Sequence, residues 1–229
     1  MDKKTWIIIA IIIAAFAGII GYNMAFRSHD DPLAQIFPAS EESGNIPENI
    51  NGNPDAPILI FEYADYQCEG CAAINPKLNQ LVEEYDGKVA VVYRNYVQSY
   101  HANGTAAASA ANAAAIQGYW KEYKNLLFAN QNEWYYSDAA TRQKQFEQYF
   151  VTATDGKGDL EKFRTDMLSD AVAAKIAFDR KLSEERHLTY TPYIYLGTTR
   201  IKESEMGNDF LDIMRQKINA ELEKLEKQN

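Results

Sequence analysis

The sequence predicts an α/β domain that carries a large all-helical insertion and follows one N-terminal transmembrane helix. Three observations support this fold class. An apolar strand, a helix and a second strand follow one another over residues 58–93, and an uncharged apolar run occupies residues 6–26. Between about residues 102 and 187 every periodic segment is helical. The length of 229 residues suits one domain with an insertion.

The N-terminal run from Trp6 to Phe26 contains no charged residue and is flanked by Lys3 and Lys4 on one side and Arg27 on the other. Twenty-one residues at about 1.5 Å each span roughly 30 Å, the thickness of a bilayer core. The basic N-terminal flank predicts that residues 1–5 are cytoplasmic. A cleaved signal peptide is the alternative, but the apolar run continues beyond the small residues that resemble a cleavage site, which favours an uncleaved anchor.

Either alternative exports the rest of the chain. We therefore expect a single-pass protein of the cell (inner) membrane, with residues 27–53 as a polar linker and an extracytoplasmic domain beyond it. In such a compartment a disulfide bond persists.

The folded part is expected in two pieces. Residues 54–101 contain strands at 58–63 and 88–93 with a helix at 72–85 between them, an order that implies a parallel pair with a right-handed crossover. Residues 188–229 contain a strand at 193–197, a hairpin partner at 198–201 and an amphipathic helix at 208–227.

The helical insertion, residues 102–187, separates these two pieces. The periodicity of the sequence predicts helices at 105–117, 119–130, 139–152 and 160–186. The first is rich in alanine.

Charge excludes one class of partner. Without Asp2, Lys3, Lys4 and Arg27, 20 basic and 31 acidic residues remain, which gives a net charge of −11. A domain this acidic repels phosphate backbones, so we expect no nucleic-acid partner.

The pair Cys68 and Cys71 contains both cysteines of the chain, spaced C-x-x-C where a strand gives way to a helix. Two cysteines are too few for a four-thiolate metal site, so no metal and no cofactor are expected. The spacing allows reversible closure of a small disulfide ring, which indicates thiol–disulfide exchange. Cys68, at the helix N-terminus, is the predicted nucleophile, and Cys71, one turn later, the resolving thiol.

The residues between the cysteines, Glu69 and Gly70, are predicted to tune the redox chemistry. The carboxylate of Glu69 opposes ionisation of Cys68 and so raises its pKa relative to a neutral spacer. This effect predicts a weaker oxidant. Gly70 is expected to give the turn the freedom to bring the two sulfurs together.

Two more positions are candidates with alternatives left open. Glu62, six residues before Cys68, is either a buried acid that exchanges protons with Cys71 or an outward-facing residue at the end of a strand. Thr191-Pro192 precedes a strand and is either a cis-proline turn beside an extended substrate or an ordinary trans turn.

Three separated motifs resemble one known family. They are Gly52-x-Pro54-x-Ala56-Pro57 followed by Ile60-Phe61-Glu62-Tyr63-x-Asp65-x-x-Cys68-x-x-Cys71, then scattered residues from His101 to Trp134, and finally Thr191-Pro192 with Tyr193 to Gly197. This order is similar to the membrane-anchored bacterial members of the DsbA-like branch of the thioredoxin superfamily. The resemblance implies a thioredoxin fold with a helical insertion, Glu62 as the buried acid, and a cis bond before Pro192.

The resemblance also implies a protein-disulfide oxidoreductase that introduces disulfides into reduced secreted proteins. A membrane-embedded, quinone-linked thiol oxidase is its expected recharging partner. The spacer Glu69-Gly70 departs from the family's usual Pro-His or Gly-Pro, which leaves the redox direction open. A disulfide reductase or isomerase is therefore one alternative, and a Cu(I)-binding chaperone module is a second.

Overall fold

The computed structural model describes residues 31–228. The predicted cytoplasmic residues 1–5 and transmembrane segment 6–26 lie outside this part of the chain. Within the described part, no helix combines the length and the apolar character that a membrane span requires. The mixed sheet at its centre has the order β1-β3-β2-β4-β5. Its strands are β1 (Asn49–Gly52), β2 (Ile58–Ala64), β3 (Val89–Asn95), β4 (Tyr193–Leu196) and β5 (Thr199–Arg200).

The expected strand–helix–strand unit forms the middle of this sheet. β2 and β3 are parallel, with Glu62 opposite Tyr93, and α2 (Glu69–Glu84) connects them. β4 lies on the other side of β2 in antiparallel orientation, with Ile194 opposite Glu62, and β5 continues the sheet as its hairpin partner. The two pieces on either side of the insertion therefore form one sheet.

The predicted linker is shorter than expected, because part of it belongs to the domain. Residues 49–52 form β1, which pairs antiparallel with β3. The polar sequence of this strand resembled a linker, but its buried amides have partners: Asn49 donates to Asn112 at 3.0 Å and Asn51 donates to Asn79 at 2.9 Å.

Arg94 fastens the segment before β1 to the sheet. Its buried guanidinium forms an ion pair with the equally buried Glu48 at 2.6 Å and donates to the carbonyl oxygens of Leu33 and Gln35 at 2.7 Å each. A buried guanidinium requires such partners, so residues 33–48 are ordered against the domain rather than forming a free spacer.

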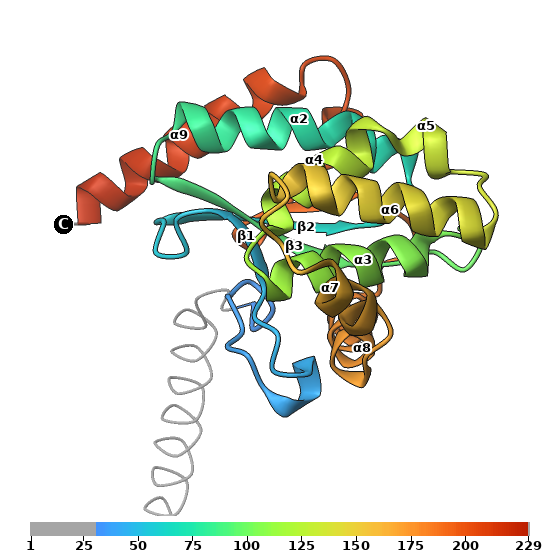
Figure 1. Ribbon diagram of the computed structural model, residues 1–229. Helices are drawn as coiled ribbons and strands as arrows, with labels where there is room; N and C mark the ends of the chain where they lie inside the picture. The colour runs from blue at the N-terminus through green and yellow to red at the C-terminus, as the bar shows by residue number, and fades with distance from the viewer. Residues whose placement is uncertain (1–30, 229) are drawn as a thin grey trace, which may run out of the picture. The chain divides into compact units, whose positions relative to one another are not determined.

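Alternation along the strands divides the core into two faces. Ile58, Ile60 and Val91 point to the face covered by α2 and α9 (Phe210–Gln228), which lie side by side in Figure 1. Phe61 and Tyr63 point to the opposite face, where Leu182 of α8 packs. Because side chains alternate with period 2, Glu62 lies on the same face as Ile60, toward α2.

The insertion consists of six helices, whose bounds are α3 (Gly104–Ile116), α4 (Trp120–Ala129), α5 (Gln131–Trp134), α6 (Ala139–Ala153), α7 (Leu160–Met167) and α8 (Asp170–Glu185). The helix expected at 160–186 is two helices, because the hydroxyl of Ser169 caps the N-terminus of α8 by accepting from the amide of Val172 at 3.3 Å. Alanines buried on several sides of α3 pack against aromatic residues of α4, α6 and α7, including Phe150 and Phe163.

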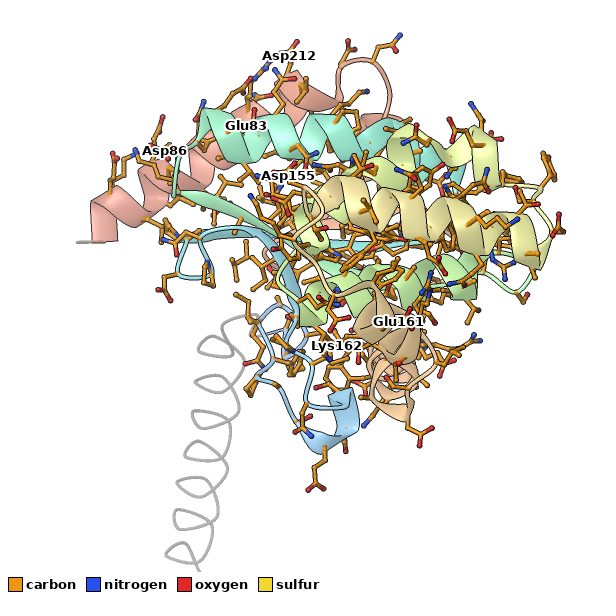
Figure 2. All side chains as sticks on the ribbon, viewed as in Figure 1. Glu83, Asp86, Asp155, Glu161, Lys162 and Asp212 are labelled. Carbon is orange, nitrogen blue, oxygen red and sulfur yellow. The ribbon has the colours of Figure 1, made fainter. Side chains whose placement is uncertain are left out.

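The remaining elements are two short 3₁₀ helices, η1 (Glu41–Ser43) and η2 (Glu203–Glu205). Exposed acidic residues occur on several helices: Figure 2 labels Glu83 on α2, Asp212 on α9 and Glu161 on α7.

Candidate active site

Cys68 lies at the junction between β2 and α2, where it is the N-cap residue of the helix. Its backbone is extended (φ −79°, ψ 121°), and its side chain is half-buried. The sulfur donates a hydrogen bond to the carbonyl oxygen of Thr191 at 3.4 Å, and the Thr191–Pro192 peptide bond is cis, as the resemblance implies. The fold thus brings Cys68, Thr191 and Pro192 together from distant parts of the sequence.

The thiolate of Cys68 is stabilised by its surroundings, which lower its pKa to about 6. The largest cause is a hydrogen bond from the Cys71 side chain. Burial acts in the opposite direction, while the Thr191 hydroxyl and the backbone N–H groups of Cys71 and Gly70 favour the charged form. That hydroxyl is buried and has no other partner within residues 31–228, so it is available to the thiolate.

Cys71 has the opposite character. It is fully buried, and both cysteines are free thiols in this structure. Burial is the main reason why the pKa of Cys71 lies well above its ordinary value, and the neighbouring Cys68 and Glu62 raise it further. At neutral pH the half-buried Cys68 is therefore a thiolate and the buried Cys71 a protonated thiol.

Glu62 is the buried acid rather than an outward-facing residue at a strand end. Its side chain is 0% exposed, and neither carboxyl oxygen has a hydrogen-bond partner within the described residues. Desolvation raises the pKa of Glu62 to about 7, Lys124 lowers it, and Cys68 raises it. A carboxyl group that titrates near neutral pH is suited to exchanging protons with a protonated thiol.

The spacer residues differ in their surroundings. Glu69 is exposed in the first turn of α2, where its charge faces solvent. Gly70 lies close to the cis-proline loop: a Cβ atom there would lie 3.2 Å from Cδ of Pro192 and 3.7 Å from Sγ of Cys68. Its role is therefore to admit the cis-proline loop, since it is an ordinary helical residue without the positive φ that a flexible turn would use.

Asp65 organises the loop that leads into Cys68, a role that the sequence did not suggest. Its buried carboxylate accepts from the backbone N–H of Gln67 at 2.9 Å and of Gln98 at 2.8 Å, and it contacts Nδ1 of His101 at 2.7 Å. These bonds tie the active-site loop to the start of the insertion. His101 thus has a positioning contact away from the two sulfurs.

Lys124 is the second residue that sequence reasoning missed. It is 1% exposed on α4, and its ammonium group donates to Oδ1 of Asn79 at 3.1 Å. One signal was present in the sequence. Large apolar residues recur at helical spacing along this segment, and Lys124 falls on the same side of the helix. These residues are Trp120, Tyr123, Leu127 and Phe128.

The surroundings of the cysteines are partly apolar. An open groove of about 310 Å³ runs beside Pro192 and is lined in part by Ile74 and Met206. Of the neighbouring aromatic residues Trp134 and Tyr136, the first packs in the core, whereas the second is 91% exposed. Within residues 31–228, no group of three or more His, Cys, Asp or Glu side chains is placed to hold a metal ion.

Several solved structures share this fold. BdbD from Bacillus subtilis superposes with a TM-score of 0.64 at 20% identity, covering 82% of this chain and 98% of that chain. The catalytic domain of Proteus mirabilis ScsC gives 0.60 at 18% identity, covering 76% and 89%. Wolbachia pipientis α-DsbA1 gives 0.60 at 20% identity, covering 80% and 94%.

Among curated proteins, the chain is similar to Na(+)/H(+) antiporter NhaA 1 of Mycolicibacterium gilvum, 26% identical over 156 residues. It is also similar to Na(+)/H(+) antiporter NhaA 3 of Salinispora tropica, 28% identical over 154 residues. These matches cover 67% of this chain but only 24% and 22% of the antiporters, so the chain spans about a quarter of the length of these relatives. The sequence model of the family described as Thioredoxin matches residues 45–215, and the chain belongs to this family.

Proposed function

We propose that the chain is a membrane-anchored, extracytoplasmic thiol:disulfide oxidoreductase that donates the Cys68–Cys71 disulfide to reduced secreted or cell-envelope proteins. The observation that carries the proposal is the contrast between the two sulfurs. The Cys68 thiolate accepts hydrogen bonds from Cys71 and from backbone N–H groups, whereas Cys71 is buried and protonated. Stabilising the thiolate favours the reduced pair, so the disulfide form is a good electron acceptor.

The chemistry begins with the oxidised pair. A substrate thiolate attacks Sγ of Cys68, the Cys68–Cys71 bond breaks, and Cys71 leaves with the electron pair and takes a proton. The second substrate thiolate then attacks the substrate sulfur of the mixed disulfide and releases Cys68 as a thiolate. The substrate loses two electrons and gains a disulfide, and the protein becomes a dithiol.

Recharging requires an electron acceptor, which we propose to be a membrane-embedded thiol oxidase linked to quinone. The apolar run at residues 6–26 supports this arrangement, because an anchor in the membrane raises the local concentration of such a partner. The reduced Cys68 attacks the partner's disulfide, and Cys71 then displaces the partner to restore the Cys68–Cys71 bond.

Substrates are expected to bind as extended peptides along the cis-proline loop. Pro192 has no N–H, which leaves adjacent backbone groups on Thr191 to face the substrate. The neighbouring groove beside Ile74 and Met206 offers apolar surface to side chains of an unfolded chain.

A reductase or isomerase is the second candidate, and the exposed carboxylate of Glu69 beside the nucleophile is the observation that favours it.

Three assays on the soluble domain separate the candidates: oxidation of a reduced unfolded protein, reactivation of the same protein with scrambled disulfides, and retention of Cu(I). We expect stoichiometric oxidation by the disulfide form, which Cys68→Ser abolishes. Reactivation of the scrambled protein without net oxidation would overturn the proposal in favour of an isomerase. Retention of Cu(I) without exchange would favour a chaperone.

A further inference from the structure

A second hollow, of about 590 Å³, adjoins the groove beside Pro192. Its lining residues are Tyr190, Arg200, Lys202, Glu203 and Ser204. Tyr190 and Glu203 also line the groove, so the two spaces are neighbours. The groove in turn reaches Thr191, whose carbonyl oxygen lies 3.4 Å from the sulfur of Cys68. A polypeptide that reacts with Cys68 and follows the groove therefore reaches the second hollow.

Arg200 is exposed in this hollow, but two aromatic residues hold its guanidinium group in place. The group lies 4.4 Å from the ring centre of Tyr193 and 6.0 Å from that of Tyr190, and it donates to the Tyr190 hydroxyl at 2.5 Å. The two ring centres lie 4.2 Å apart. Tyr193 belongs to β4 and Arg200 to its partner strand β5, so the sheet supports this arrangement. An arginine that is already ordered loses less side-chain entropy when it binds an anion.

Basic residues outnumber acidic ones around the two spaces, although the domain as a whole is acidic. Lys77 lines the groove, and Arg200 and Lys202 line the hollow, against Glu203 as the acid in either lining. Within residues 31–228 none of the three bases forms an ion pair, and Lys77 donates instead to the carbonyl oxygen of Gly207 at 2.9 Å. Residues 28–229 contain 20 basic and 31 acidic residues, so the charge here is locally reversed.

A carboxylate is the ligand group that fits these bases. The planar fork of arginine binds carboxylates and phosphates at two points, and an unfolded protein supplies carboxylates from Asp and Glu. The acids nearest in sequence do not use this capacity. Glu205 pairs with Lys217 at 3.0 Å, and Glu203 forms no ion pair with either base of the hollow in the described part of the chain. The bases are therefore left for an acid of the substrate.

We propose that Arg200 and Lys202 select substrates by an acidic side chain that lies a few residues from the reacting cysteine. The inference rests on the proposed function and narrows its substrate class to cysteine-containing segments that carry Asp or Glu. The exchange chemistry is unchanged, because the carboxylate binds the guanidinium group without reacting. Complementary charge acts mainly on the rate of association and on the choice of partner.

The test is the rate at which the disulfide form of the domain oxidises short peptides. Each peptide carries one pair of cysteines and differs at a single position, which holds Asp, Asn or Lys. That position is moved through about four residues on either side of the attacking cysteine, a span of roughly 13 Å in each direction. Division by the rate of the same peptide with an uncharged small disulfide removes differences in intrinsic thiol reactivity.

At the best position and at low ionic strength, we expect the Asp peptide to react about threefold faster than the Asn peptide. The Lys peptide is expected to react about tenfold more slowly than the Asp peptide, because the bases repel it. Added salt should reduce both ratios, since it screens exposed charges.

Four variants assign the preference to the hollow. Arg200→Gln is expected to bring the Asp-to-Asn ratio close to one, whereas Arg200→Lys, which keeps the charge, retains most of it. Lys202→Gln should lower the ratio in part, and it supplies the reading if Arg200→Gln does not fold. Glu203→Gln removes the opposing acid and should raise the ratio. Lys88→Gln is the matched control, because Lys88 is an exposed base without an ion pair in the described residues and precedes β3, at the end of the parallel pair away from Cys68.

Equal corrected rates for the Asp, Asn and Lys peptides at every position would overturn the inference. A preference that persists unchanged in the folded Arg200→Gln and Lys202→Gln proteins would do the same. Failure of the wild-type domain to oxidise any of the peptides would instead contradict the proposed function.

Discussion

In its protonated form the sulfur of Cys68 donates a hydrogen bond to the carbonyl oxygen of Thr191 over 3.4 Å, although 123 residues separate the two in sequence. This contact joins the C-x-x-C helix to the cis-proline loop, and it places the nucleophile where a substrate strand would bind. The reactivity of Cys68 therefore depends on groups from both sides of the insertion.

The first prediction concerns the thiolate. Absorbance at 240 nm of the reduced domain should rise with a midpoint near pH 6, because hydrogen bonds lower the pKa of Cys68 to about 6. Cys71→Ala removes the largest of these bonds, so its midpoint should move toward the ordinary value of about 8.5. An equal midpoint in both proteins would show that Cys71 does not stabilise the thiolate.

The second prediction concerns Glu69. Replacing it with Gln removes a negative charge beside the nucleophile, so the pKa of Cys68 should fall by about half a unit and the disulfide should become more oxidising. Glu83→Gln, an exposed acid further along the same helix, is the matched control and should have no effect. Thiolate titration and redox equilibration measure both quantities. An unchanged pKa of Cys68 in Glu69→Gln would show that Glu69 does not tune the nucleophile.

The third prediction concerns Gly70. Alanine there has better helix propensity, by about 1 kcal/mol, but its Cβ atom would lie only 3.2 Å from Pro192. We expect Gly70→Ala to keep or raise the melting temperature while slowing oxidation of a protein substrate a few-fold, and Gly70→Val to slow it further. Thermal unfolding and a substrate assay separate the two effects. Full activity in Gly70→Val would contradict a role for this close approach.

The fourth prediction concerns Glu62 and pH. Its pKa is about 7 in the folded protein and about 4.5 when exposed, so the folded state binds the proton more tightly. Unfolding therefore releases protons between these values, and the free energy of unfolding contributed by Glu62 falls as pH rises from about 4.5 to 7. Urea unfolding of wild-type and Glu62→Gln proteins at several pH values should reveal this slope as their difference. A constant difference across this range would contradict the buried, proton-exchanging acid.

Periodicity was sufficient to predict β2, β3, β4 and β5 and most of the helices. The apolar runs at β2 and β3, with a helical pattern between them, predicted the central parallel pair, because these signals are local. The strand β1 was not predicted, because its asparagines are typical of a linker. Their hydrogen-bond partners, Asn79 and Asn112, lie far away in sequence. The break at Ser169 was missed for a similar reason: the apolar spacing continues across the cap.

The site was predictable where its chemistry is local in sequence. The cysteine spacing indicated exchange chemistry, and the resemblance implied the buried acid and the cis bond. Lys124 and Asp65 were not found, because their contacts, with Asn79 and with His101, join residues that are far apart in sequence, and no local pattern encodes them. The role of Gly70 was not predictable either, because it depends on the close approach of the loop that contains Pro192.

The redox potential of the Cys68–Cys71 pair, measured by equilibrating the domain with glutathione buffers, tests the proposed direction of electron flow most directly. A nucleophile pKa of about 6 lies between those typical of thioredoxin and of DsbA, whose potentials are about −270 and about −120 mV. The account predicts a value between about −270 and about −120 mV, which lies above the potentials of structural disulfides in secreted proteins (below about −300 mV) and is therefore oxidising enough to donate disulfides to them. A potential at or below about −270 mV would contradict it and indicate a reductase.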